Sequence, residues 1–244
     1  MIPKVIHYCW FGGKPLPPLA EKCVASWRKY LPDYEIREWN ESNFDVAAHP
    51  YTKAAYQAGL YAFVSDYARF KILYEYGGLY FDTDVEVIAP MDDIVAGGPF
   101  MGFENDGIKG KMAVAPGLGL GADPGMDLYR EILDRYDTLP FLLENGERNP
   151  FSMIALVTEL LVSKGLKGNV GVEEAGGIHV YPQAWFNPFD DATGRLRKTP
   201  DTRSIHWYSK SWMPKESGLY VWAKRFARRL FGSGFVASVG KRIK

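Results

Sequence analysis

Residues Ser65–Val87 read SDYARFKILYEYGGLYFDTDVEV and contain the end of one predicted element and the whole of the next. Tyr61–Tyr76 carries apolar residues at helical spacing without proline or glycine, which predicts an α-helix. Gly77 and Gly78 follow, and glycine ends helices where the backbone turns through positive φ. Leu79–Val87 alternates between two kinds of side chain, which predicts a β-strand. The stretch therefore predicts a helix that turns sharply into a strand.

Alternation places four side chains on one face of this strand, because residues two apart point the same way. They are Tyr80, Asp82, Asp84 and Glu86. Adjacent carboxylates repel, and such a pair persists where a cation or a shared proton relieves the repulsion. Carboxylate oxygens suit Mg²⁺ or Mn²⁺, which also bind diphosphates. Asp82 and Asp84 are therefore predicted metal ligands, and the alternative is a solvated strand edge.

The helix contributes a second charged pair, because Asp66 and Arg69 are three residues apart and share a face. The pattern S-D-x-x-R followed by G-G-x-Y-x-D-x-D resembles the core of the DXD glycosyltransferases. That family includes the yeast-type α-1,6-mannosyltransferases and many bacterial capsule glycosyltransferases. The pattern is also similar to the glucosylating domain of the large clostridial toxins. The whole combination is specific, whereas a bare D-x-D occurs by chance in many proteins.

The resemblance implies a role for each polar residue of the stretch. Asp84 binds Mn²⁺ or Mg²⁺ directly, and Asp82 binds the ribose or a metal-bound water. Asp66 and Arg69 hold sugar and ribose hydroxyls, and Tyr80 shapes the sugar pocket. The implied cofactor is the divalent cation, and the implied donor substrate is a nucleotide-diphosphate sugar.

Two distant segments extend the resemblance. IPKVIHYCWFGG begins at Ile2, and in the family a tryptophan at this strand end stacks on the base of the donor, which implies that role for Trp10. The alternative is a tryptophan in the core, and His7 in mid-strand is read as a core histidine. The second segment matches H-x-x-x-x-S-W and carries His206, Ser211 and Trp212. His206 is implied as a third metal ligand, with Ser211 and Trp212 closing over the diphosphate.

The order of predicted elements along the first hundred residues alternates strands and helices, which indicates an α/β sheet. The predicted strands are Ile2–Phe11, Tyr34–Trp39, Leu79–Val87 and Pro99–Glu104, and the predicted helices are Leu19–Tyr30, Pro50–Gly59 and Tyr61–Tyr76. The resemblance implies a GT-A type nucleotide-diphospho-sugar transferase fold, with a Rossmann-like mixed central sheet flanked by helices. Further helices are predicted at Met126–Tyr136 and Asn149–Ser163, and a strand at Ile178–Tyr181.

Two segments leave alternatives open. Lys109–Gly125 is rich in glycine and is either a flexible loop over the donor or a pair of strands with tight turns. It is not a P-loop, because no G-K-[ST] follows. The aromatic residues Trp185, Phe186 and Phe189 form either an acceptor platform or part of the core.

Composition narrows the classes of partner. The 244 residues have a formal net charge of zero, from 29 basic and 29 acidic residues, which argues against a nucleic-acid partner. Two cysteines, Cys9 and Cys23, do not make a disulfide framework or a zinc site. The N-terminus does not read as a signal peptide, and no apolar run reaches the roughly 18 residues of a membrane span. These features predict a cytoplasmic protein.

Residues 218–244 differ from the rest, because they carry seven basic residues and no acidic one. Leu219, Trp222, Phe226 and Leu230 lie near one face of a helix there, which suits an anionic membrane surface. The alternative is a helix packed on the domain. We therefore predict a glycosyltransferase domain at residues 1–217 and a basic amphipathic tail at 218–244 that docks on the inner membrane leaflet.

Together these features predict a metal-dependent retaining hexosyltransferase. It moves a hexose or N-acetylhexosamine, from a UDP-sugar by preference, to a saccharide or lipid-linked saccharide acceptor in capsule, O-antigen or exopolysaccharide biosynthesis. One alternative is a nucleotide-sugar or carbohydrate binding module without turnover, which needs no metal. A toxin-like protein glycosyltransferase and a two-metal phosphohydrolase are further alternatives; the latter chemistry calls for a second cluster of ligands.

Overall fold

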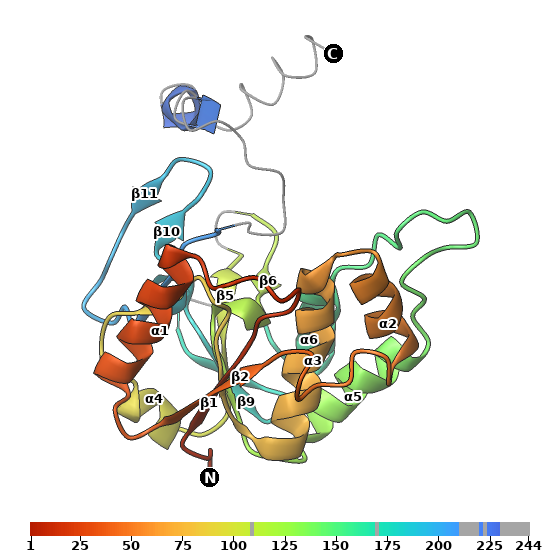
Figure 1. Ribbon diagram of the computed structural model, residues 1–244. Helices are drawn as coiled ribbons and strands as arrows, with labels where there is room; N and C mark the ends of the chain where they lie inside the picture. The colour runs from red at the N-terminus through yellow and green to blue at the C-terminus, as the bar shows by residue number, and fades with distance from the viewer. Residues whose placement is uncertain (108–109, 169–170, 210–219, 222–223, 230–244) are drawn as a thin grey trace.

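The computed structural model describes residues 1–107, 110–168, 171–209, 220–221 and 224–229. Its centre is an eight-stranded mixed sheet with helices on both faces (Figure 1). The strands along its main path run in the order β2 (Glu35–Trp39), β1 (Val5–Cys9), β3 (Gly78–Tyr80), β7 (Leu120–Ala122), β5 (Phe100–Asn105), β9 (Ile178–Tyr181) and β8 (Glu173–Ala175), and β6 (Ala113–Val114) pairs with β5. The predicted Rossmann-like mixed sheet flanked by helices is confirmed.

Parallel and antiparallel pairs occur side by side in this sheet. β1 is parallel to both β2 and β3, so the carboxyl ends of these three strands share one edge. β7 then runs antiparallel to β3 and β5, and β9 is parallel to β5. In open α/β sheets, ligands bind beyond the carboxyl ends of the strands. The edge that follows β1, β2 and β3 is therefore where a binding site is expected.

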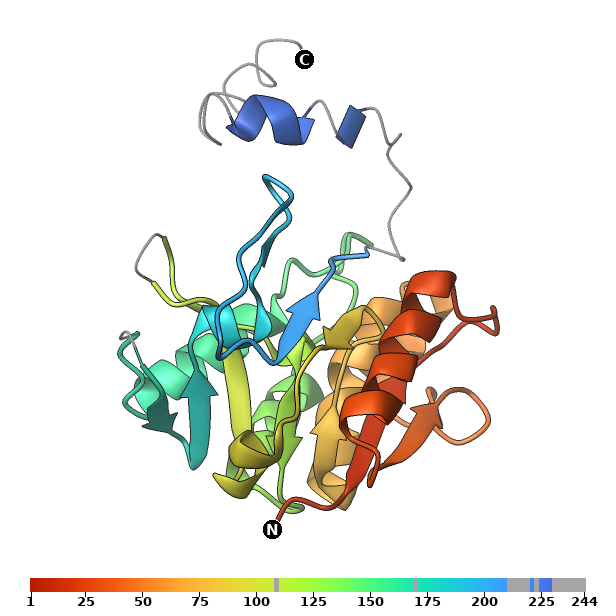
Figure 2. The ribbon, with the colours of Figure 1, turned by 90° about the vertical axis from the view of Figure 1, so that its left-hand side faces the viewer.

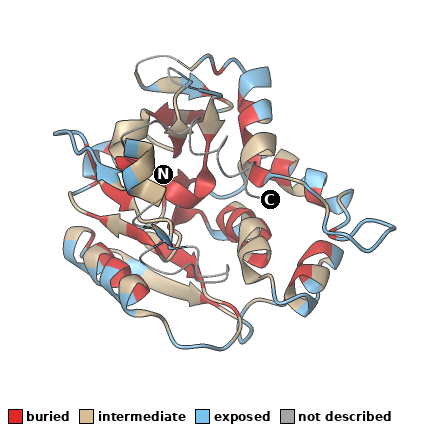
Figure 3. Ribbon diagram, turned by 90° about the horizontal axis from the view of Figure 1, so that it is seen from above, coloured by how far each residue is buried: buried red, intermediate tan, exposed pale blue. Residues whose placement is uncertain are grey.

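Two cores cover the two faces of the sheet. On one face pack α2 (Pro50–Gln57), α3 (Tyr61–Tyr76), α5 (Asp127–Asp137) and α6 (Met153–Ser163). On the other face pack α1 (Pro18–Tyr30), α4 (Asp92–Ala96) and α7 (Gln183–Phe186). Consecutive strand residues alternate between the cores: Leu79 belongs to the α1 side and Tyr80 to the α3 side. Buried residues accordingly line the strands and the inward faces of the helices (Figure 3).

Helix α3 has the predicted bounds, and its glycine pair explains how it ends. Gly77 and Gly78 have φ of 64° and 99°, which L-residues with a side chain rarely adopt. A Cβ on Gly78 would also lie 2.6 Å from the carbonyl oxygen of Val5. The glycines therefore let the chain reverse and enter the sheet directly against β1.

The predicted strand Leu79–Val87 is wrong as a single element. It is divided into β3 and β4 (Val85–Val87) by a turn in which the Val85 N–H donates to the carbonyl oxygen of Asp82 at 3.0 Å. β4 leaves the large sheet and pairs with β12 (Ser204–His206), as Figure 2 shows. The shared face predicted for the four polar residues is therefore wrong as well. Tyr80 is buried among the α3-side residues, and the two aspartates lie in the turn.

The glycine-rich segment and the aromatic loop each resolve to one alternative. The segment forms β6, a short 3₁₀ turn at Pro116–Leu118, and β7, so it contains strands with tight turns; they pair with β5 and β3 and not with each other. Phe186 and Phe189 are 0% and 8% exposed, which confirms the core reading for these two residues, whereas Trp185 is only partly buried against the same core. Helix α6 begins four residues later than the predicted Asn149, because the Ser152 hydroxyl accepts a hydrogen bond from the Ala155 N–H and caps it there.

Most of the predicted tail 218–244 lies outside the described residues. Within the described part, Arg225 donates to Asp191 at 2.8 Å, and Arg229 donates to the carbonyl oxygen of Thr193 at 2.6 Å. Both acceptors lie in the turn of the hairpin formed by β10 (Phe189–Asp190) and β11 (Arg195–Leu196). None of the helices in the described part of the chain is both long and apolar enough to span a membrane.

Candidate active site

The turn after β3 brings the two aspartates of the D-x-D pattern to the carboxyl edge of the sheet. Antiparallel pairing of β12 with β4 sets His206 opposite Val85, directly after Asp84. As a result, His206 Nε2 lies 3.1 Å from Asp84 Oδ1. One ligand atom each from Asp82, Asp84 and His206 falls within 4.8 Å of the others. The structure therefore gathers the three residues predicted as metal ligands, although they are 124 positions apart in sequence at the extremes.

Asp84 is the most firmly held member of this group. Its Oδ2 accepts a hydrogen bond from the Ser209 N–H at 2.7 Å, and its carbonyl oxygen accepts one from the Trp207 N–H at 3.0 Å. Burial alone would raise the pKa of Asp84, but hydrogen bonds from His206 and Ser209 hold it at about 2. Asp84 is therefore ionised at neutral pH. The same pairing raises the pKa of His206 despite its burial.

Arg69 joins the predicted helix pair to the D-x-D turn. Its Nη2 lies 2.9 Å from Asp66 Oδ1 and 3.1 Å from Asp82 Oδ1, and the residue is only 4% exposed. The guanidinium also lies over the ring of Tyr80 at 5.1 Å from its centroid. Burial raises the pKa of Asp66 to about 6 and also raises that of Asp82, with Arg69 opposing both shifts. Arg69 thus compensates two partly buried carboxylates at once.

The donor set fits a divalent cation. Two carboxylates and one imidazole are ligands that Mn²⁺ and Mg²⁺ sites use, with imidazole favouring the transition metal. His206 Nε2 lies 3.1 Å from Asp84 Oδ1, so the two atoms are close enough to bind one cation together. Asp82 also accepts a hydrogen bond from Arg69, so this member of the metal group is in direct contact with the predicted sugar-binding arginine.

Trp10 is only partly buried and follows β1 at the same edge of the sheet. Its indole N–H donates to the carbonyl oxygen of Lys14 at 2.6 Å, and its ring packs against the α1-side core. Stacking of this ring on a base stays a prediction, as do the sugar-binding roles of Asp66, Arg69 and Tyr80. Ser211 and Trp212 lie outside the described residues. His7 is fully buried between Trp39 and Gly77, and burial lowers its pKa to about 4, which confirms a neutral core histidine.

The structure reveals one site residue that the sequence did not indicate. Gly117, in the 3₁₀ turn Pro116–Leu118, lies against Asp82, whose N–H is 3.4 Å from the Gly117 carbonyl oxygen. A Cβ on Gly117 would overlap Asp82 Oδ2 and lie 3.4 Å from Arg69 Nη1. The glycine-rich segment therefore supplies a backbone wall behind the Asp82 carboxylate.

We expect Gly117→Ala to displace the Asp82 side chain, because the added methyl group and the carboxylate oxygen cannot occupy the same space. The expected result is a loss of about tenfold or more in any activity that depends on Asp82, with a destabilisation of about 1–3 kcal/mol. Gly171→Ala is the matched control, since nothing lies within 4 Å of a Cβ at that position. Equal activity of the two variants would show that Asp82 does not need this wall.

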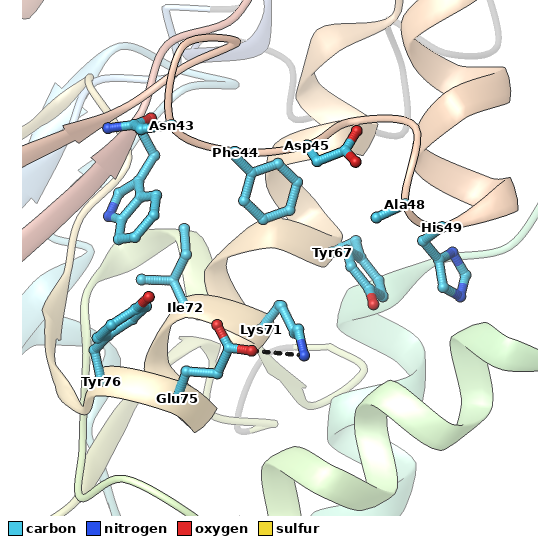
Figure 4. Close-up of a pocket in the computed structure, with 11 residues that line it drawn as sticks. Asn43, Phe44, Asp45, Ala48, His49, Tyr67, Lys71, Ile72, Glu75 and Tyr76 are labelled. Carbon is cyan, nitrogen blue, oxygen red and sulfur yellow. Dashed lines mark ion pairs between the residues drawn. The ribbon is translucent and has the colours of Figure 1, made fainter.

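A separate pocket of about 350 Å³ lies beside α3 (Figure 4). Trp39 and Tyr67 contribute to its walls, and Lys71 forms an ion pair of 2.7 Å with Glu75 beside it. Glu75 is nine residues from Asp66, and at about 100° per residue their side chains leave opposite faces of the helix. The pocket therefore lies on the far side of α3 from Asp66, and its described lining includes none of the predicted site residues.

Comparison with known proteins finds similarity to a described family over the part of the chain that contains the D-x-D turn. Residues 17–101 match the family described as "Glycosyltransferase sugar-binding region containing DXD motif". Inositol phosphoceramide mannosyltransferase 3 of Schizosaccharomyces pombe (strain 972 / ATCC 24843) is 31% identical over 101 residues, which cover 38% of this chain and 27% of that protein. The chain thus spans about a quarter of the length of this curated relative.

Three of the solved structures that resemble the chain illustrate the range of these matches. The PaToxG glycosyltransferase has a TM-score of 0.44 and 18% identity, over 55% of this chain and 59% of that one. A glycosyltransferase involved in the glycosylation of the major capsid of PBCV-1 has a TM-score of 0.46 and 13% identity, over 85% and 95%. The galactosyltransferase LgtC, in complex with donor and acceptor sugar analogs, has a TM-score of 0.45 and 14% identity, over 94% and 95%.

The matched segment contains α1, the paired Asp66 and Arg69 of α3, and the turn with Asp82 and Asp84. The similarity to the glycosyltransferase sugar-binding region containing the DXD motif therefore covers residues 17–101 of this chain.

Proposed function

We propose that the chain is a metal-dependent retaining glycosyltransferase of the GT-A type. It moves a hexose or N-acetylhexosamine from a nucleotide-diphosphate sugar, with a UDP-sugar favoured, to a saccharide acceptor. The observation that carries the proposal is the gathering of Asp82, Asp84 and His206 within 4.8 Å at the carboxyl edge of the sheet. The matched sugar-binding region supports it, because that region contains the same D-x-D turn.

Asp82, Asp84 and His206 would hold Mn²⁺ or Mg²⁺, and the bound cation supplies neutralisation of the charge that builds on a departing diphosphate. Asp84 enters this role already ionised, because hydrogen bonds hold its pKa at about 2. Arg69 keeps Asp82 and Asp66 in place and presents the edge of its guanidinium to them both. Asp66 and Asp82 retain carboxylate oxygens that can accept hydrogen bonds from sugar and ribose hydroxyls.

Retention of the anomeric configuration is proposed to follow a front-face route. In that route the acceptor hydroxyl attacks the anomeric carbon from the side that the diphosphate leaves, and the leaving phosphate oxygen takes the acceptor's proton. The chain's residues then have to orient donor and acceptor and to exclude water. Trp10, at the end of β1, is proposed to hold the base by stacking, which contributes about 1–3 kcal/mol per base in comparable systems.

The biological setting is a finer proposal. We infer a saccharide or lipid-linked saccharide acceptor in capsule, O-antigen or exopolysaccharide synthesis from the resemblance of the D-x-D stretch. Seven basic residues and no acidic one in residues 218–244 support docking on an anionic membrane surface. Two of those basic residues, Arg225 and Arg229, bind the β10–β11 hairpin of the same chain.

Because residues 218–244 carry the seven basic residues, their removal is expected to weaken binding to anionic vesicles. Donor turnover is expected to persist, because the proposed metal ligands lie outside this segment.

The proposal is tested by incubating the purified chain with a panel of UDP- and GDP-sugars in Mn²⁺ or in EDTA, with released nucleotide measured. The expected result is slow hydrolysis of one donor that requires the metal. Binding of each nucleotide sugar is measured on the same samples, because some transferases hydrolyse their donor only when the acceptor is present. If EDTA left the affinity for the nucleotide sugar unchanged and no turnover occurred, a binding module would be favoured and the proposed transfer would be overturned.

A further inference from the structure

Tyr208 has an uncommon backbone conformation next to the metal group. Its φ is 51°, and it is the one non-glycine residue with positive φ in the described ranges. A side chain with a Cβ is unfavourable in this region, and such strain persists only where the surroundings hold it in place. Tyr208 follows His206 by two positions, so the strain is adjacent to a predicted metal ligand.

Both ends of the Tyr208 side chain are fixed. Its ring lies 4.1 Å from the ring of His206, measured between centroids. Its hydroxyl accepts a hydrogen bond from Asn187 Nδ2 at 2.8 Å and donates one to Glu104 Oε1 at 3.1 Å. Asn187 is only 3% exposed and also donates to the carbonyl oxygen of Glu104 at 3.3 Å. The tyrosine therefore links the imidazole of His206 to the end of β5.

The left-handed residue also lies between two amides that bind Asp84, one at its backbone carbonyl oxygen and one at its carboxylate. The N–H of Trp207 donates to the Asp84 carbonyl oxygen at 3.0 Å, and the N–H of Ser209 donates to Asp84 Oδ2 at 2.7 Å. The conformation of Tyr208 thus directs the amide of the next residue, Ser209, to the Asp84 carboxylate, and its ring lies against the imidazole of His206.

We propose that Tyr208 is a positioning residue that fixes His206 and Asp84 in the arrangement that binds a divalent cation. The inference deepens the proposed function and rests on it, because it assigns to that site a residue outside the D-x-D turn. The Tyr208 ring contacts His206, so the tyrosine would act on the cation through this ligand. Residues that orient metal ligands in this way typically change metal affinity by about 10–100-fold when they are replaced.

The test uses the full chain and Mn²⁺ alone, with free Mn²⁺ followed by its electron paramagnetic resonance signal. Tyr208→Asn is the principal variant, because asparagine tolerates the left-handed conformation while the ring and hydroxyl are lost. We expect its Kd for Mn²⁺ to rise about tenfold or more. Tyr208→Phe keeps the ring over His206 and loses only the two hydroxyl hydrogen bonds, so a smaller rise is expected. Tyr30→Phe, which loses a hydroxyl at the end of α1, is the control.

Thermal unfolding of the same samples separates positioning from general stability. Asparagine tolerates the backbone conformation at position 208, so the thermal unfolding midpoint of Tyr208→Asn without metal is expected to fall only slightly. A large loss of Mn²⁺ affinity with a small change in the midpoint would indicate positioning of the ligands rather than general stability. A Tyr208→Asn chain that binds Mn²⁺ within about twofold of wild type would overturn the inference. If Asp84→Ala abolished binding in that same series, the proposed metal site would stand and only the role of Tyr208 would fall. A wild-type chain without saturable Mn²⁺ binding would overturn both.

Discussion

Asp84→Ala is expected to lose metal-dependent donor hydrolysis by about 10²–10³-fold, the size of effect seen when one charge-stabilising group is removed from an active site. Asp84 is the ionised carboxylate nearest His206, at 3.1 Å, and its replacement removes both a proposed metal ligand and the partner of that histidine. The measurement is release of nucleotide from the donor identified in the panel, at saturating Mn²⁺.

Two further variants make this result specific. Alanine also leaves the N–H of Ser209 without its carboxylate acceptor, so some loss of stability is expected. Asp84→Asn retains an oxygen for that hydrogen bond and removes only the charge, so it is expected to lose activity with a smaller change in stability. Asp33→Ala removes a carboxylate that is 75% exposed and is expected to leave activity unchanged. Full hydrolysis by Asp84→Asn at the same Mn²⁺ concentration would contradict the proposed role.

Arg69→Met is expected to have the largest effect on folding, lowering the free energy of unfolding by about 3 kcal/mol. The reason is that one 4% exposed guanidinium compensates both Asp66 and Asp82, whose side chains are 24% and 28% exposed. Methionine fills much of the same volume but leaves two neighbouring carboxylates without their cation. Urea unfolding at pH 7 measures the change through the midpoint and slope.

Lys71→Met provides the matched control on the same helix. Lys71 pairs with Glu75, and both side chains are more than 40% exposed, so the loss is expected to stay below about 1 kcal/mol. Equal losses of stability for Arg69→Met and Lys71→Met would show that Arg69 does not compensate the carboxylates as the geometry indicates.

Arg69→Met is also expected to gain stability as the pH falls from 7 to 5, relative to wild type, because its uncompensated carboxylates can then take up protons.

Local sequence signals were sufficient where the structure is local. The bounds of α3 follow from its unbroken apolar periodicity and from the glycine pair that must end it, and the structure has the same bounds. The residues Phe81–Val85 keep the same alternation through a turn, so their pattern could not show that the strand stops. The turn depends on the pairing of β4 with β12, which lies more than a hundred residues further along the chain.

In the candidate site as well, the sequence predicted contacts between near neighbours but not contacts between distant residues. Helical spacing predicted that Asp66 and Arg69 are neighbours, but nothing in the sequence indicated that Arg69 also reaches Asp82, thirteen positions away. The assignment of His206 to the same site as the aspartates followed from the resemblance; the structure places its Nε2 3.1 Å from Asp84 Oδ1, and its role as a metal ligand stays a prediction. Gly117 was one of several glycines in its segment, and only the packing of its backbone on Asp82 distinguishes it. Tyrosine is not a residue type that favours positive φ, so the sequence could not indicate the left-handed conformation of Tyr208.

The most direct test of the account is a crystal structure of the chain with Mn²⁺ and UDP, in which anomalous scattering locates the metal. The account predicts one Mn²⁺ within coordination distance of Asp84 and His206, with the UDP diphosphate bound to the same ion beside Arg69. Mn²⁺ away from these residues, or UDP bound elsewhere, for example in the pocket on the far side of α3, would contradict it.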